Sequence, residues 1–215
     1  MQVNELFAQP NTILLDGGMG TMLQAAGLKL GARPEELNLT DPALIEGIHA
    51  QYAAAGSRII NANTFGASAH KLAGSAYTLE EVIAAGIANC KRACAPFGAL
   101  AALDVGPLGE LLEPNGTRTF EDAVAEFGRI VRAGAAAGAD LIFFETFTDL
   151  YELKAALLAA KENSTLPILA SMSFEAGGRT FTGCTVESFA ATARGLGADA
   201  IGINCSLGPR EIFPM

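Results

Sequence analysis

The feature that most constrains this chain is a repeated alternation between short β-rich runs and helical patterns. The β-rich runs are nearly continuous in apolar residues, as expected for strands that are buried on both faces of a parallel sheet. They lie at 12–18, 57–65, 98–107, 140–147, 166–174 and 199–206. Helical patterns follow the first five runs, at about 42–55, 79–95, 120–137, 149–163 and 186–196. This alternation with short joins predicts successive βαβ units and therefore an α/β fold.

Capping signals support the predicted helices. Asp41 stands where an N-cap is expected, Pro42 occupies the first helical position, and Gly56 stops the pattern. The longest stretches without periodicity are 19–41 and 106–119, and both follow a predicted strand. Functional loops occupy that place in α/β folds, so we expect both stretches to carry function.

Polar and reactive side chains gather where each predicted strand ends. In a barrel of parallel strands all those ends share one rim, whereas a doubly wound sheet brings only a subset to its switch point. The breadth of the pattern favours a (βα)8 TIM-type barrel. Six strands and five helices fall short of eight of each, so we expect a single domain over 1–215 that is truncated at its C-terminal end. The strand-end residues are Asp16-Gly17-Gly18, Asn61 to Thr64, Asp104, Glu145-Thr146, Ser173 and Asn204-Cys205.

Composition excludes several classes of protein. A net charge of −9 and a pI of about 4.7 predict repulsion from phosphate, so we expect neither nucleic-acid nor anionic-membrane binding. The N-terminus lacks a signal-peptide pattern, and no apolar run reaches the length of a membrane span. Four scattered cysteines do not form a secreted disulfide framework. These three observations together predict a cytoplasmic protein.

Three strand-end motifs are candidate ligand sites. In "DGGMGT", Asp16, Gly17 and Gly18 form either an anion-binding nest or a tight turn, and the third glycine of a dinucleotide fingerprint is missing. Asn63 and Thr64 in "NANTFGA" are suited to bind a ligand or to satisfy loop backbone. Glu145 follows four apolar residues, where a carboxylate is costly unless it binds a cation such as a substrate ammonium.

Cys205 is the most specific candidate for a functional residue, because it lies at the end of the last predicted strand. A thiol at such a rim can be a zinc ligand, a nucleophile or a small packing residue. No His/Cys cluster lies near it in the sequence. Cys90 and Cys94 share a predicted helix face, where buried packing is favoured, and Cys184 lies in a loop.

Together these motifs resemble a known family. "LLDGGMGT", "PEELNLT", "NTFGA", "DVGPLGELLEPNG", "FFETFTD" and "GINCSLGP" occur in the order and spacing of homocysteine S-methyltransferases. The resemblance covers the chain from about residue 12. It is closest to the N-terminal, homocysteine-binding modules of cobalamin-dependent methionine synthases.

The resemblance implies a (βα)8 barrel that binds homocysteine and zinc and transfers a methyl group to the substrate sulfur, giving methionine. It implies that Asp16, Gly17 and Gly18 hold the amino-acid part, that Glu145 pairs with the ammonium, and that Cys205 is a zinc ligand. The predicted substrate-binding set is completed by Asn63, Thr64 and Asn204. The implied methyl donor is methylcobalamin on another module, so the implied partners are the cobalamin and folate modules of a longer protein.

The sequence departs from the family in one respect. The family's other two zinc ligands are an adjacent cysteine pair near the end of the eighth strand, and these 215 residues contain no such pair. Two alternatives therefore stay open: a stand-alone enzyme that uses betaine or S-methylmethionine, and a non-catalytic fragment. A metal-free aldolase-like barrel ranks last, because no predicted strand ends in a Schiff-base lysine.

Overall fold

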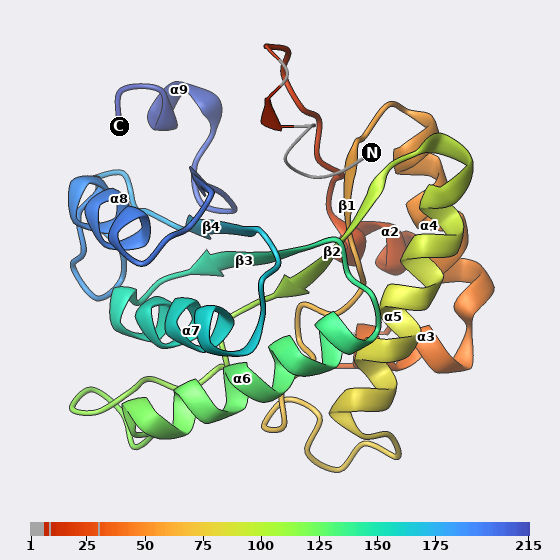
Figure 1. Cartoon of the computed structure of the whole chain (residues 1–215), viewed down its shortest axis with the longest axis horizontal. Coiled ribbons are helices and arrows are strands. Elements are labelled where there is room, and N and C mark those ends of the chain that lie inside the picture. Colours follow the sequence, from red (N-terminus) through yellow and green to blue (C-terminus); the bar gives the residue numbers. More distant parts are fainter. Residues whose placement is uncertain (1–6, 9, 30) are drawn as a thin grey trace. The chain divides into compact units, whose positions relative to one another are not determined.

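The computed structural model describes residues 7–8, 10–29 and 31–215, and its order of elements follows the predicted alternation (Figure 1). The chain divides into two compact units. One comprises the residues up to Asp104 together with Ala133–Leu141, and the other comprises Val105–Arg132 with Ile142–Met215. Across the described residues there are five strands and eight α-helices.

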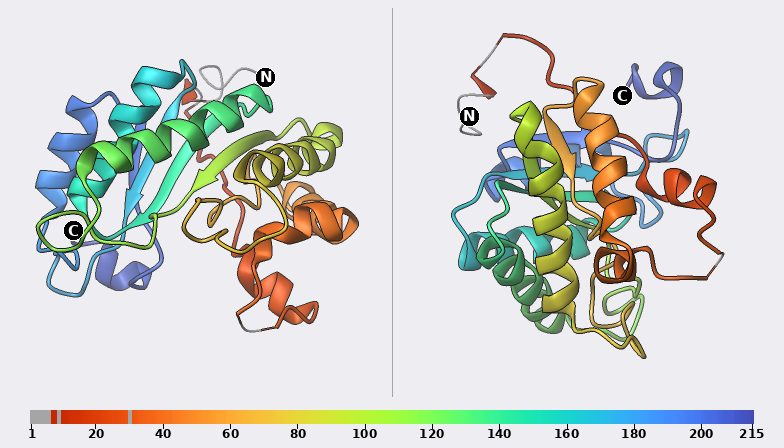
Figure 2. Two further views of the ribbon diagram at one scale, coloured as in Figure 1. Left: turned by 90° about the horizontal axis from the view of Figure 1, so that it is seen from below. Right: turned by 90° about the vertical axis from the view of Figure 1, so that its right-hand side faces the viewer.

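The first unit contains a parallel strand pair and a set of helices that follow its strands. β1 pairs with β2 in the register Ile59 to Leu100 and Asn61 to Ala102. Helices α4 and α5 lie side by side, as the right-hand view of Figure 2 shows in orange and yellow-green. The elements are α2 (Met19–Ala25), η1 (Pro34–Glu36), α3 (Leu37–Thr40), α4 (Pro42–Ala54), β1 (Ile59–Asn61), α5 (Leu79–Cys94), η2 (Ala95–Phe97) and β2 (Leu100–Val105, whose last residue falls in the second unit).

The second unit contains three parallel strands in the order β3, β4, β5. Phe143 lies opposite Leu169 on β4, and Ala170 lies opposite Ile201 on β5. Asp149 accepts the backbone N–H of Tyr151 at 3.0 Å and so caps α7. The elements are α6 (Phe120–Ala136, whose last turn belongs to the first unit), β3 (Leu141–Phe147), α7 (Leu150–Asn163), β4 (Ile168–Met172), α8 (Val186–Gly195), β5 (Ala200–Ile203) and α9 (Pro209–Ile212).

Aromatic packing fixes α6 against β3 within the second unit. Phe127 on α6 meets Phe144 and Phe147 of β3 with ring centroids 6.1 and 5.9 Å apart, and all three rings are fully buried. Edge-on and tilted pairs at this spacing are favourable beyond the area that they bury. The apolar run of β3 therefore explains its position in the core.

The predicted helices are confirmed to within about two residues, but the first predicted strand is wrong as a strand. Residues 12–18 make only one parallel bridge, from Leu15 to Ile59, supported by a hydrogen bond from the Arg58 N–H to the Leu14 carbonyl at 2.8 Å. Leu14 and Leu15 are 53% and 37% exposed, so this segment lacks the two-sided burial of a central strand.

The predicted loop at 19–41 contains structure that the sequence pattern did not reveal. It holds α2, η1 and α3, which have seven, three and four residues. Elements this short span too few turns to show a helical period. The other predicted loop, 106–119, has no helix, and its only pairing in the described structure is a bridge between Leu112 and Arg118.

His49 is a buried polar residue on α4 of the first unit. It is fully buried, and neither of its ring nitrogens has a hydrogen-bond partner. Burial lowers the pKa of His49 from 6.5 to about 4, while nearby Glu46 acts in the opposite direction with a smaller effect. The folded protein therefore holds this imidazole neutral.

We expect His49 to make the folded state acid-sensitive. Between pH 6.5 and about 4 the unfolded chain binds a proton at His49 and the folded chain does not, so stability falls as pH falls through that window. The shift corresponds to about 3 kcal/mol. Chemical denaturation at pH 7 and at pH 4.5 measures how much unfolding free energy is lost on acidification, and this loss should be smaller in His49→Leu than in wild type. His70 is exposed, so His70→Leu should lose as much as wild type. Equal losses in all three proteins would refute the assignment.

Gly134 near the end of α6 marks a close approach to β2 within the first unit. A Cβ atom there would lie 2.4 Å from Cδ2 and 2.9 Å from Cγ of Leu103, which is fully buried. Such distances are well inside van der Waals contact, so either the buried Leu103 side chain or the end of α6 would have to shift.

We expect Gly134→Ala to lower the unfolding free energy by about 1–3 kcal/mol through overpacking. Gly47→Ala on α4 is the matched control, because a Cβ atom there meets nothing within 4 Å. Gly47→Ala should raise the unfolding free energy by about 0.5–1 kcal/mol, because alanine has the higher helix propensity. Urea denaturation of both variants measures the two changes, and a neutral Gly134→Ala would contradict the close packing.

Candidate functional site

The end of the first predicted strand is tied to β1 through Asp16. Its Oδ2 accepts the backbone N–H of Asn61 at 3.0 Å. Gly17 lies against Tyr52 of α4, because a Cβ atom there would lie 2.9 Å from the Tyr52 hydroxyl oxygen. That hydroxyl donates to the carbonyl of Gly18 at 3.4 Å. The "DGG" turn therefore contacts α4, and a side chain at position 17 would require the Tyr52 ring to shift.

Asn63 and Thr64 direct their donors into the protein. The Asn63 amide donates to the carbonyl of Pro34 at 2.8 Å and to Oδ1 of Asn38 at 3.1 Å. The Thr64 hydroxyl donates to the carbonyl of Asp104 at 2.8 Å. Both side chains are buried, so they fix the loop that follows β1 at the end of that strand.

Glu35 and Asn38 are residues of this region that the motif analysis did not single out. Glu35 is 7% exposed and accepts the backbone N–H of Gly66 at 2.7 Å. Asn38 donates to the carbonyl of Asn63 at 2.7 Å, which makes a reciprocal amide pair. The "PEELNLT" and "NTFGA" motifs are thus hydrogen-bonded to each other. Glu35 and Gly66 are 31 residues apart, so the sequence pattern could not predict that they are in contact.

In the second unit, Asn204 connects the ends of β3 and β5. Its side-chain NH2 group lies 3.2 Å from Oε2 of Glu145, 2.9 Å from the Thr146 hydroxyl and 3.5 Å from Sγ of Cys205. The structure therefore brings together Glu145, Asn204 and Cys205, three of the residues predicted from the sequence.

Glu145 is partly buried near the end of β3, and burial raises the pKa of its carboxyl group. The Asn204 amide offsets only part of the lost hydration, because it is a neutral donor. A cation beside this carboxylate would restore the missing stabilisation. The arrangement is therefore chemically suited to bind an ammonium group.

Two residues of this cluster have left-handed backbone conformations. Thr146 has φ 64° and Cys205 has φ 62°. Residues other than glycine and asparagine rarely adopt this backbone region. Such strain is typical of functional sites, where it aims a side chain. The thiol of Cys205 is free, and the residue is exposed.

The described residues contain no cluster of three or more His, Cys, Asp or Glu side chains that could hold a metal ion. Cys90 and Cys94 are buried on α5 with sulfur atoms 3.8 Å apart, which confirms the packing role predicted for them. Cys184 is partly buried in the loop before α8. Cys205, which the resemblance implies to be a zinc ligand, therefore belongs to no such cluster among the described residues.

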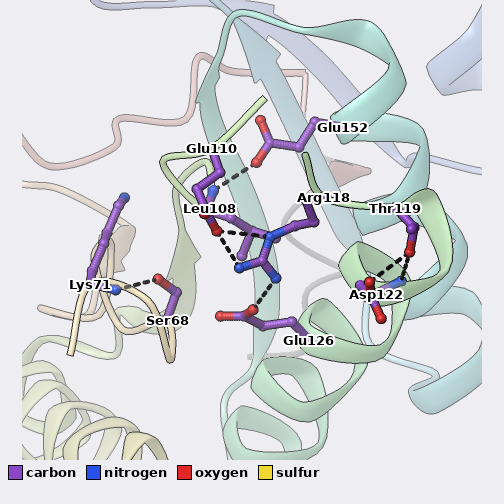
Figure 3. A network of polar contacts seen from close by, with 9 residues as sticks. All are labelled: Ser68, Lys71, Leu108, Glu110, Arg118, Thr119, Asp122, Glu126 and Glu152. Atoms are coloured by element: carbon purple, nitrogen blue, oxygen red, sulfur yellow. Dashed lines mark hydrogen bonds and ion pairs between the residues drawn. The ribbon is translucent and has the colours of Figure 1, made fainter. Parts of the chain in front are cut away.

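Arg118 organises the loop between β2 and α6, and no motif in the sequence had indicated this role. Its guanidinium group lies 2.5 Å from carboxylate oxygens of both Glu110 and Glu126, and Figure 3 shows it between them. In the same loop the backbone N–H of Leu108 donates to Oε1 of buried Glu152 at 2.7 Å. A loop without regular structure is therefore anchored to α6 and α7.

Comparisons with known proteins place this geometry in a family. Residues 13–215 match the family model described as homocysteine S-methyltransferase. Methionine synthases of Mycobacterium tuberculosis and Mycobacterium leprae are 31% and 30% identical over 92% of this chain. The chain spans only 18% of the length of either relative. No described helix is long and apolar enough to cross a membrane.

Solved structures agree on the fold. The metallated form of the homocysteine methyltransferase MmuM from Escherichia coli superposes with a TM-score of 0.85 at 20% identity, covering 98% of this chain and 80% of that one. Its apo form gives 0.73 at 23% identity, covering 96% and 76%. These matches confirm the predicted α/β class of the TIM-barrel type. With the family match over nearly its whole length, the chain belongs to the homocysteine S-methyltransferase family.

Proposed function

We propose that this chain binds homocysteine as the methyl acceptor of a methionine synthase. The observation that carries the proposal is the cluster of Glu145, Asn204 and Cys205. A partly buried carboxylate with a raised pKa is matched to the substrate ammonium, and a free thiol stands beside it. The sequence relatives named methionine synthase support this reading over other members of the family.

In the proposed reaction, the homocysteine sulfur attacks the methyl carbon of the donor. A sulfur–carbon bond forms, the bond between methyl and donor breaks, and the donor keeps that electron pair. The thiol proton of homocysteine is released, because the thiolate is the nucleophile. In this scheme Glu145 and Asn204 bind and orient the acceptor, and no described residue is assigned to chemical catalysis.

The remaining predicted substrate residues lie in the first unit. We propose that Asp16, Gly17 and Gly18 bind the amino-acid part of homocysteine. Because the donors of Asn63 and Thr64 bond within the protein, we propose that these two residues serve the substrate by holding the loop that follows β1.

Zinc is proposed for the family chemistry, but the described residues do not fit a complete zinc site. A catalytic zinc usually has about three protein ligands, and Cys205 is one. We therefore propose Cys205 as a ligand whose partners come from outside the described residues. Bound zinc would lower the pKa of the substrate thiol.

Methylcobalamin on another module is the proposed donor, with cobalamin and folate modules as partners in a cytoplasmic enzyme. A stand-alone enzyme that uses betaine or S-methylmethionine is the alternative within the family. The second candidate function is non-catalytic binding of homocysteine, which the single candidate metal ligand among the described residues favours.

We expect Glu145→Gln to weaken homocysteine binding by about 10- to 100-fold, because the ammonium loses its charged partner. The same variant should raise the thermal midpoint, because burial disfavours the charged carboxyl group. Isothermal titration calorimetry and thermal unfolding measure the two effects. Glu162→Gln, at an exposed position on α7, is the control and should change neither. Wild-type affinity in Glu145→Gln would refute the assignment.

We expect the 215-residue chain to retain well under one equivalent of zinc after desalting, because one thiolate does not complete a site. Metal analysis of wild type, Cys205→Ser and Cys184→Ser measures this directly. One equivalent that is lost in Cys205→Ser and kept in Cys184→Ser would contradict the expectation and show that other groups of the chain complete the site.

A further inference from the structure

Ser171 lies on β4, beneath the cluster of Glu145, Asn204 and Cys205. It is 2% exposed, and its hydroxyl donates to Oδ1 of Asn204 at 3.0 Å. Ser171 is opposite Gly202 in the register of β4 and β5. Asn204 directly follows β5, two residues after Gly202.

The orientation of the Asn204 amide follows from its partners. The backbone N–H of Thr146 can only donate, so the Asn204 atom 3.1 Å from it must be the oxygen, Oδ1. The Ser171 hydroxyl reaches the same oxygen and fills its second acceptor position. The NH2 group is thereby left to face Glu145, the Thr146 hydroxyl and Cys205.

A reversed amide would lose this complementarity. Its NH2 group would face the N–H of Thr146, and its oxygen would face the carboxylate of Glu145. Both contacts are repulsive, so the Thr146 N–H and the Glu145 carboxylate determine which way the amide faces. The Ser171 hydroxyl can donate or accept, so its role is to restrain the rotation of the amide about the bond that carries it. Ser171 thus acts on the cluster through Asn204 without reaching Glu145 or Cys205 in any described hydrogen bond.

We infer that Ser171 is a positioning residue of the proposed acceptor site: its hydroxyl restrains the Asn204 amide with the NH2 group facing Glu145, the Thr146 hydroxyl and Cys205. The effect on ligand binding rests on the proposed function, whereas the orientation of the amide does not. Removal of the hydroxyl leaves the Thr146 N–H as the sole restraint on the amide oxygen, which lets the amide rotate.

Ser173 provides a matched control on the same segment. Its hydroxyl donates to the backbone carbonyl of Asn204 at 2.9 Å, so it contacts the same residue without contacting the amide. Ser173→Ala and Ser171→Ala each remove one hydrogen bond to Asn204. If Ser171 merely stabilises the fold, the two variants should behave alike.

The test compares Ser171→Ala, Ser171→Cys, Ser171→Thr and Ser173→Ala in the full chain. Ser171→Cys keeps the side-chain volume with a weak donor, and Ser171→Thr keeps the hydroxyl. Calorimetry measures homocysteine affinity, and the side-chain NH2 signals of Asn204 are followed by NMR without ligand. We expect about tenfold weaker binding and shifted or broadened Asn204 signals in the alanine and cysteine variants. The threonine and Ser173→Ala variants should stay within about twofold of wild type.

Two results would overturn the inference. One is an unchanged set of Asn204 NH2 signals in both Ser171→Ala and Ser171→Cys. The other is an equal loss of affinity in Ser171→Ala and Ser173→Ala. If the wild-type chain does not bind homocysteine, the proposed function fails instead, and the NMR signals still decide whether Ser171 orients the amide. If Ser171→Ala does not fold, Ser171→Cys carries both measurements.

Discussion

The side-chain amide of Asn204 joins the ends of three parallel strands, and the candidate site of the second unit depends on it. It bonds to Glu145 and Thr146 on β3, to Ser171 on β4, and to its own neighbour Cys205 after β5. Parallel strands are connected laterally by backbone hydrogen bonds, but those bonds stop where the strands end. One amide with both donors and acceptors engaged continues the connection beyond the sheet, and it does so at the point where charged and reactive groups are presented.

Much of the architecture could be predicted from the sequence. The apolar runs that became β2 to β5 and the five long helices were visible as patterns, because burial on both faces and capping leave strong marks. The segment 12–18 looked like a strand by composition, yet its leucines are partly exposed and it makes one bridge. Pairing depends on neighbours far away in sequence, which composition does not encode.

Part of the candidate site could likewise be predicted from the sequence, and part could not. Glu145, Asn204 and Cys205 were predicted because polar residues at the end of an apolar run are conspicuous, and the structure brings the three together. Glu35, Asn38 and Ser171 were not predicted to have a role in the site. They act through contacts with residues 25 to 33 positions away, and only the folded register creates these contacts. The sequence thus indicated the polar groups at the strand ends better than the groups that hold them in place.

The left-handed backbone at Cys205 has a consequence for how related sequences should vary. A side chain there costs roughly 1–3 kcal/mol of backbone strain, from which glycine is exempt. Any lineage that no longer uses the thiol can gain stability by a single change to glycine or asparagine. If the proposed role of the thiol holds, relatives that have lost this role should carry glycine or asparagine at this position, and relatives that keep the role should carry cysteine despite the strain.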